Sequence, residues 1–179
     1  MPVPALKTWI AWGIIAALSA CADTHEIVRY GTSEIPRLSP SDSFYIAVTR
    51  DGVYGSKPYP GSGLTTAQIL LASLAKRARR VETGRAAESY DEALASARKS
   101  GYKYLVFPTI LHWEDRATEW SGIPDRVEVK LELVDVSTGR TLDSGVIRGK
   151  SGLGTLGGDH PQDLLPKPVE EYVSKFFAT

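Results

Sequence analysis

Residues 126–133, RVEVKLEL, alternate strictly between charged and apolar side chains, and this pattern constrains the fold more than any other part of the chain. Successive side chains of a β-strand point to opposite faces of the sheet, so the two kinds separate onto two faces. The apolar face holds Val127, Val129, Leu131 and Leu133, and the charged face holds Glu128, Lys130 and Glu132. The segment therefore predicts a strand in a sheet with one face on a core and one face in water.

Further strands are predicted on both sides of this one along the chain. FYIAV, at residues 44–48, is short and rich in residues that favour strands. YKYLVFPTIL, at 102–111, is apolar on both faces, which is typical of a central strand covered on two sides. Because Pro108 cannot donate a backbone hydrogen bond, a bulge or a locally free edge is expected there. STGR, at 137–140, predicts a turn, and TLDSGVI, at 141–147, the return strand.

Three segments have the apolar spacing of amphipathic helices. They are TTAQILLASLAKRARRV at 65–81, a segment that begins near residue 89 and stops at Gly101, and PVEEYVSKFF at 168–177. The first two open with capping boxes, and the third has Pro168 at its first helical position. The two boxes are Thr65 with Gln68, and Ser89 with Glu92. VETGR, between the first two helices, holds a short strand.

These elements predict an α+β fold, with a single mixed or antiparallel sheet and three helices packed on it. The predicted order is β-α-(β)-α-β-β-β-α, and residues 43–179 form a single globular domain of ordinary size.

The N-terminus resembles a bacterial lipoprotein signal. Lys7 supplies positive charge, TWIAWGIIAALSA is apolar but too short to span a bilayer comfortably, and LSAC at 18–21 resembles the lipobox. The resemblance implies a signal peptide at residues 1–20, acylation of the Cys21 thiol and cleavage before Cys21. Ala22 after the cysteine favours the outer membrane over the inner membrane under the lipoprotein sorting rule. An uncleaved N-terminal helix with a chance cysteine is the alternative.

Residues 21–42 are polar, contain two prolines and show no sustained period, which predicts a flexible tether behind the acylated cysteine. About 20 residues reach roughly 70 Å when fully extended and nearer 25 Å as a coil. The alternative for EIVRY, at 26–30, is a short edge strand.

Composition excludes several classes of function. The chain has 21 basic and 21 acidic side chains and no basic run, whereas nucleic-acid binding depends on neutralising phosphates. Cys21 is the one cysteine, so its lipidation leaves no disulfide and no thiolate metal site. PGSGLTT, at 60–66, has two glycines but lacks the lysine of the Walker pattern and the third glycine of the dinucleotide fingerprint, and no cofactor is predicted.

Three stretches carry a resemblance: ILHWEDRATEWSGIPDR, VDVSTGRTLDS and GGDHPQDLL. They resemble a family of uncharacterised proteobacterial lipoproteins defined by a domain of unknown function, from about Ser39 to Tyr172. The family has no established activity, so the resemblance implies no catalytic residue. More loosely, the element order is similar to the N-terminal domain of the Tol-system periplasmic protein, the curli-secretion lipoprotein and lipoprotein activators of penicillin-binding proteins. These imply an adaptor or assembly role.

HWEDRATEW, at residues 112–120, is interpreted as part of a hairpin with SGIPD as its turn. Trp120 then lies opposite Arg126 and can form a cation–π contact with it, while Glu114 lies opposite Glu132. The charged side chains of the two strands form a solvated lattice, namely Glu114, Arg116, Glu128, Lys130 and Glu132.

Strict alternation points Asp115 toward the apolar side, where a bare carboxylate is costly. A bulge or a bound cation would relieve that cost. A metal-dependent hydrolase would need His112, Asp115 and His160 to converge in space, since no metal-ligand spacing is local in the sequence. Structural histidines are the simpler interpretation. His160 precedes Pro161 in GGDHPQDLL, which predicts a helix cap, with an anion site as its alternative.

The loop at 53–63 carries Tyr54 and Tyr59 among glycines and prolines, which suits a rigid binding loop. The alternative is a loop folded back on its own sheet. Together these observations predict a lipid-anchored periplasmic protein that binds a protein or cell-wall partner and is not an enzyme. Tyr54, Tyr59, Trp120 and Arg126 are the candidate binding residues. The alternatives are the hydrolase, acting on an envelope substrate, and a structural lipoprotein that forms homo-oligomers through a free sheet edge.

Overall fold

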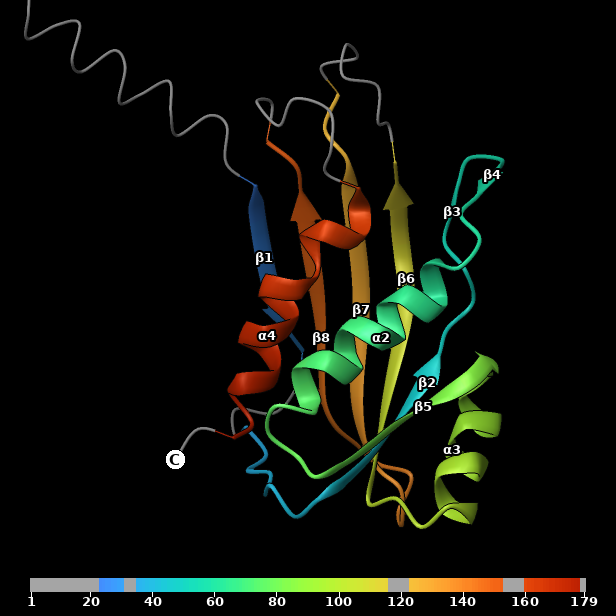
Figure 1. Ribbon diagram of the computed structural model, residues 1–179, viewed down its shortest axis with the longest axis vertical. Helices are drawn as coiled ribbons and strands as arrows, with labels where there is room; N and C mark the ends of the chain where they lie inside the picture. Colours follow the sequence, from blue (N-terminus) through green and yellow to red (C-terminus); the bar gives the residue numbers. More distant parts are fainter. Residues whose placement is uncertain (1–22, 31–34, 116–122, 153–159, 178–179) are drawn as a thin grey trace, which may run out of the picture.

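The computed structural model describes residues 23–30, 35–115, 123–152 and 160–177. Within them the chain forms a six-stranded mixed sheet, a two-stranded hairpin and three α-helices, so the predicted α+β class is confirmed (Figure 1). The strands are β1 (Thr24–Arg29), β2 (Ser43–Val48), β3 (Val53–Tyr54), β4 (Lys57–Pro58), β5 (Arg80–Ala87), β6 (Tyr104–Glu114), β7 (Arg126–Asp135) and β8 (Thr141–Lys150). The helices are α2 (Ser62–Leu74), α3 (Tyr90–Lys99), the 3₁₀ helix η2 (Pro161–Leu164) and α4 (Pro166–Ser174).

The main sheet has the strand order β1-β8-β7-β6-β2-β5. Consecutive strands β6, β7 and β8 pair antiparallel, and β1 adds antiparallel to β8. On the other side, β2 pairs parallel with both β6 and β5, as crossover connections through helices require. β1 and β5 are therefore the two edges of the sheet.

Helices cover the two faces of the sheet unequally (Figure 1). α2 and α4 pack on one face over the larger core, which includes Phe44, Ile46 and the predicted apolar set of β7. α3 packs on the opposite face over a smaller core with Tyr45 and Ala47. On this second face α3 reaches β7 only near Val134, and no described helix covers the charged residues of β7 from Glu128 to Lys130. Among the helices described, none has the length and apolarity to cross a membrane.

The predicted start of the first helix is wrong. α2 begins at Ser62 after Gly61, which has φ +88°, and not at a capping box of Thr65 and Gln68. The Asp51 carboxylate instead accepts hydrogen bonds from the backbone N–H groups of Gly61 (3.0 Å) and Gly63 (2.8 Å). A carboxylate from a distant loop satisfies the same free donors that a local cap would satisfy.

The first helix also ends earlier than its apolar spacing predicts, at Leu74 rather than near residue 81. The reason is tertiary pairing, because residues from Arg80 onward join the sheet as β5 beside β2. The second helix follows its prediction: Ser89 and Glu92 form the capping box, and Gly101 follows the helix with φ +68°.

Pro108, which has no backbone N–H to donate, lies in β6 beyond the part of the strand that pairs with β2. β2 pairs with β6 only as far as Val106, so Pro108 is beyond that pairing on one side, and a register shift follows near Leu111. A locally free edge and a bulge are thus both present in β6.

The flexible tether expected through residue 42 is wrong for residues 24–29, which form the edge strand β1 and pair with β8 along their whole length. Arg29 reaches across to the buried carboxylate of Asp143, with Nε 3.4 Å from Oδ2 and an ion pair to Oδ1. Tyr172 of α4 donates to the same carboxylate. The alternative given for residues 26–30, a short edge strand, is confirmed, and the strand begins two residues earlier, at Thr24. Local periodicity could not decide between strand and tether, because the residues that pair with this strand lie more than a hundred positions away.

Candidate functional site

Four strands of the main sheet begin or end side by side at one end of the molecule. Thr24 pairs with Lys150, Lys150 with Arg126, and Arg126 with Glu114. We call this the loop end and define it by these four residues. The hairpin β3–β4 and η2 lie at the same end (Figure 1).

The hairpin register expected around this end is wrong. Glu114 lies opposite Arg126, not opposite Glu132, because the connection runs from residue 115 to 125 and is longer than the five-residue turn expected. Contacts to other segments hold both ends of this connection. The Asp125 N–H donates to the Ser151 hydroxyl at 2.8 Å, and the Ser151 N–H donates to the Asp125 carbonyl at 3.1 Å.

His112 and Glu114 form a pair at the end of β6. They point to the same face, as residues two apart in a strand do, and His112 Nε2 lies 2.9 Å from Glu114 Oε2. Glu114 is buried, with 3% of its surface exposed, so its expected place in a solvated lattice is wrong. Lys130 and Glu132 do form a surface ion pair, and Glu128 pairs with Arg148 of β8. Arg116 lies outside the described residues.

Asp115 and His160 form a second pair. Asp115 Oδ2 lies 3.4 Å from His160 Nδ1. The Tyr59 hydroxyl donates to the backbone carbonyl of Asp115 and accepts from its N–H, both at 3.3 Å. The His160 N–H donates to the Asp163 carboxylate at 3.0 Å at the start of η2, as the predicted cap requires.

The three residues proposed for a metal site are therefore divided between two contacts. Asp115 contacts His160, whereas His112 contacts Glu114. In residues 23–30, 35–115, 123–152 and 160–177, no three His, Cys, Asp or Glu side chains gather in a way that could hold a metal ion. Nothing in the described geometry supports the hydrolase.

The two tyrosines of the 53–63 loop have different environments. Tyr59 is half-buried and packs against the larger core, with Lys57 Nζ 4.8 Å from its ring centroid. Tyr54 is 37% exposed, and its edge contacts the His112 ring at a centroid distance of 5.2 Å. Tyr59 thus fixes the loop to β6, while Tyr54 keeps an accessible face. Of the other two candidate binding residues, Arg126 is exposed and Trp120 lies outside the described residues.

Charges at the loop end are arranged unevenly. The carboxylates of Asp51, Asp115 and Asp163 accept from groups of the same chain, as described above. In contrast, Arg126 and Lys150 form no salt bridge within the described chain, and both are exposed. Lys150 was not among the predicted binding residues, although Arg148 and Lys150 alternate with Ile147 and Gly149 and so extend the predicted strand to it.

An open hollow of about 330 Å³ lies against the first residues of β1 and β7 and the last residues of β8. Its charged lining comprises Glu26, Arg126, Glu128, Arg148 and Lys150. Arg148 pairs with both carboxylates, with contacts of 3.1 Å to Glu26 and 3.4 Å to Glu128. Of the charged side chains that line the hollow, Arg126 and Lys150 are the two without an ion pair in the described residues.

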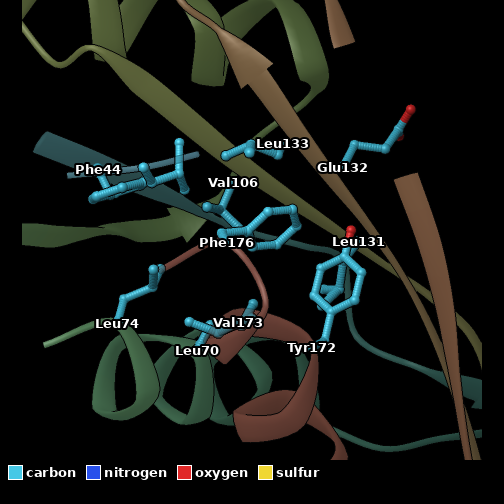
Figure 2. A pocket seen from close by; sticks show the side chains of 11 residues that line it. Phe44, Leu70, Leu74, Val106, Leu131, Glu132, Leu133, Tyr172, Val173 and Phe176 are labelled. Carbon is cyan, nitrogen blue, oxygen red and sulfur yellow. The ribbon is translucent and has the colours of Figure 1, made fainter. Parts of the chain in front are cut away.

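A second cavity lies in the core between α2, α4 and the sheet (Figure 2). It measures about 20 Å³, its surface is apolar, and side chains such as Phe44, Leu70 and Phe176 surround it. Figure 2 shows the Glu132 side chain directed away from these side chains. A space of roughly one water molecule with apolar walls is a packing void, not a ligand site.

Comparison with known proteins places the chain in a family. Residues 36–176 match the family model described as Domain of unknown function (DUF4823). The chain belongs to this family. The membership expected from the sequence motifs, in a family defined by a domain of unknown function, is thereby confirmed. No curated protein matches the sequence.

Several solved structures resemble the chain, and the first of them shares its fold. The PelC dodecamer from Paraburkholderia phytofirmans has a TM-score of 0.69 and 17% identity, and the match covers 87% of this chain and 99% of that chain. A DUF330 protein of Xanthomonas campestris has a TM-score of 0.49 and 10% identity, with 81% and 86% covered. Lipoprotein GNA1162 from Neisseria meningitidis has a TM-score of 0.45 and 14% identity, with 74% and 99% covered. PelC shows that this fold forms a dodecamer elsewhere.

Proposed function

We propose that this protein is an acyl-anchored module of the bacterial envelope that acts by binding other proteins and not by catalysis. Acylation of Cys21 holds it on the periplasmic face of the outer membrane. Its partners are other envelope proteins, including further copies of itself.

The position of β1 supports this proposal most directly. Thr24, the first residue of β1, is the third residue after Cys21. β1 is paired with β8 at every residue and is further fixed through Arg29 and Asp143. An anchor on Cys21 therefore positions the whole folded domain, with only a short connection between lipid and sheet.

Two features support assembly. Within the described chain, β1 and β5 each pair on one side only, and they lie at opposite edges of the same sheet. Edges of this kind can pair head to tail between identical subunits, and such contacts form a ring when the rotation closes. The likeness to a protein that forms a dodecamer is in accord with this mode.

Mass spectrometry of the full chain expressed in a Gram-negative host tests the anchor. We expect the mature N-terminal peptide to begin at Cys21 and to carry diacylglycerol and a further acyl chain. The matched Cys21→Ala variant should retain the uncleaved precursor mass, and density fractionation should place the wild type with outer membranes. A mature chain that begins elsewhere, or a cysteine without acyl mass, would overturn the proposal.

Light scattering of the detergent-solubilised protein tests assembly, and we expect the mass of an oligomer of two or more protomers. A pull-down from solubilised envelopes tests other partners, with Tyr54→Ala compared with the wild type because Tyr59 supports the loop itself. A monomer with identical partner lists for both proteins would remove the binding role.

A further inference from the structure

We propose that the loop end is a membrane-docking surface that binds the headgroup region of a bilayer containing anionic phospholipid. The inference rests on the proposed function for the position of the anchor. It adds a second membrane contact, made by side chains of the folded domain.

The segment between Cys21 and β1 is short enough to keep the loop end next to the membrane. Thr24 is the third residue after Cys21, and three residue steps of fully extended chain span about 10 Å. Thr24 pairs directly with Lys150, so β1 cannot swing away from the sheet without breaking the ladder. An acyl group in the bilayer therefore places the ends of β1, β8 and β7 at the headgroups.

Exposed apolar side chains lie at this same end. Val53 (57% exposed), Tyr54, Leu111 (52%) and Ile123 (47%) come from the β3–β4 hairpin, the end of β6 and the segment before β7. Apolar and aromatic side chains beside a bilayer lower their free energy by entering the boundary between headgroups and acyl chains.

The charge distribution fits an anionic surface. Arg126 and Lys150 have no ion-pair partner in the described chain, and Lys57 projects from the hairpin with its charge above the Tyr59 ring. The neighbouring carboxylates contact donors of their own chain, as described above. These basic side chains are therefore available to attract the phosphate groups of a membrane surface, because the nearby carboxylates are already paired within the chain. The attraction acts within about one Debye length.

The opposite end supplies matched controls. Tyr30 is 61% exposed but follows the last residue of β1, so it is about 20 Å from Thr24 along the strand. Arg37 and Arg140 are exposed cations without an ion-pair partner in the described chain, and they also lie away from the loop end.

The experiment uses the full-length, acylated protein reconstituted into phosphatidylcholine vesicles with or without phosphatidylglycerol. Acylation blocks the Cys21 thiol, so Val53→Cys, Ile123→Cys and Tyr30→Cys each provide a single site for an environment-sensitive fluorophore. We expect the emission at positions 53 and 123 to shift to shorter wavelength and to be quenched by nitroxide-labelled lipid. The emission at position 30 should show neither effect.

A charge-reversal pair tests the headgroup class. Arg126→Glu/Lys150→Glu should lose the additional quenching at position 123 that phosphatidylglycerol produces, whereas Arg37→Glu/Arg140→Glu should retain it. Circular dichroism checks that both variants are folded.

Each outcome decides between the two proposals. If the N-terminal peptide of the same sample carries acyl mass but positions 53 and 123 remain unquenched, the docking surface is overturned and the anchored function stands. If acyl mass is absent, both fail. Quenching that does not depend on phosphatidylglycerol or on Arg126 and Lys150 would overturn the anionic specificity.

Discussion

Asp143 is the most deeply buried carboxylate of the described chain, with 1% of its surface exposed, and two side chains hold it. Arg29 comes from the edge strand β1, and Tyr172 comes from α4. Burial and the adjacent carboxylate raise the pKa of the Tyr172 hydroxyl, so this hydroxyl stays protonated and donates. One carboxylate thus connects the N-terminal edge strand to a helix near the other end of the chain.

Arg29→Ala should destabilise the protein by about 3–5 kcal/mol, because it leaves the Asp143 charge buried without its cation. Urea unfolding monitored by circular dichroism measures the change. Arg37→Ala, at an exposed site without an ion-pair partner in the described chain, should cost less than about 0.5 kcal/mol. Equal stabilities for the two variants would mean that Arg29 does not neutralise Asp143.

Tyr59→Phe should cost about 1 kcal/mol, since it removes a hydroxyl that both donates to and accepts from the backbone of Asp115. The measurement is again the free energy of unfolding in urea, with Tyr30→Phe as the exposed control. A neutral effect at Tyr59 would show that water replaces the hydroxyl, and that the loop is not fixed to β6 through it.

At the scale of secondary-structure elements, α2 and α4 are held together by Glu170. Its carboxylate contacts Arg77, accepts from Ser73 at 2.9 Å and lies 3.2 Å from Lys76 Nζ. These donors, Arg77 foremost, lower the pKa of Glu170 from 4.5 to about 2. The folded state therefore favours the charged form more than the unfolded chain does.

A depressed pKa in the folded state makes stability depend on pH in one direction. The contribution of Glu170 is complete above about pH 4.5 and is lost as the pH falls toward 2. Glu170→Gln should lower stability by roughly 1 kcal/mol at pH 7, a value reduced for the partial exposure of the group. The difference from the wild type should vanish near pH 2. Urea titrations at several pH values measure it, and a difference independent of pH would contradict the ion-pair origin.

Helices and strands could be predicted from the sequence where residues close together in the chain determine them. The alternating strand around Val129 and the Ser89 capping box depend on near neighbours, and both are confirmed. The start of α2 depends on Asp51, and β1 depends on β8, so neither could be found from local periodicity. The register of β6 and β7 was wrong for the same reason, because distant contacts determine the length of their connection.

At the scale of the whole molecule, the proposed docking surface depends on the distance between the proposed acyl anchor and the sheet. Insertion of about ten Gly/Ser residues between Ala22 and Asp23 adds a coil of roughly 17 Å and should leave acylation intact. The quenching of a fluorophore at position 123 should then fall, because the loop end is no longer confined to the bilayer. An equal insertion between Phe177 and Ala178 is the control. Unchanged quenching would mean that the side chains bind lipid without help from the anchor.

The candidate site was only partly predictable. Its residue types were visible, and both the region around His112 and the 53–63 loop were named as candidate contact regions. Their adjacency, seen in the contact of Tyr54 with His112, was not predicted. The pairing of Asp115 with His160, and the separation of His112 from them, depends on a fold in which η2 returns to the end of β6. Such convergence of distant segments has no local signal in the sequence.

The antiparallel pairing of β1 with β8 also determines how the protein carries force. If Cys21 is anchored as proposed, a partner that pulls the folded domain away from the membrane applies tension between Cys21 and the far end of the sheet, along the axis of β1. The ladder bonds lie across that axis, so they are loaded together in shear and are not opened one after another. In the proposed anchored protein, β1 would therefore resist detachment under load, because all of its ladder bonds to β8 would have to break together.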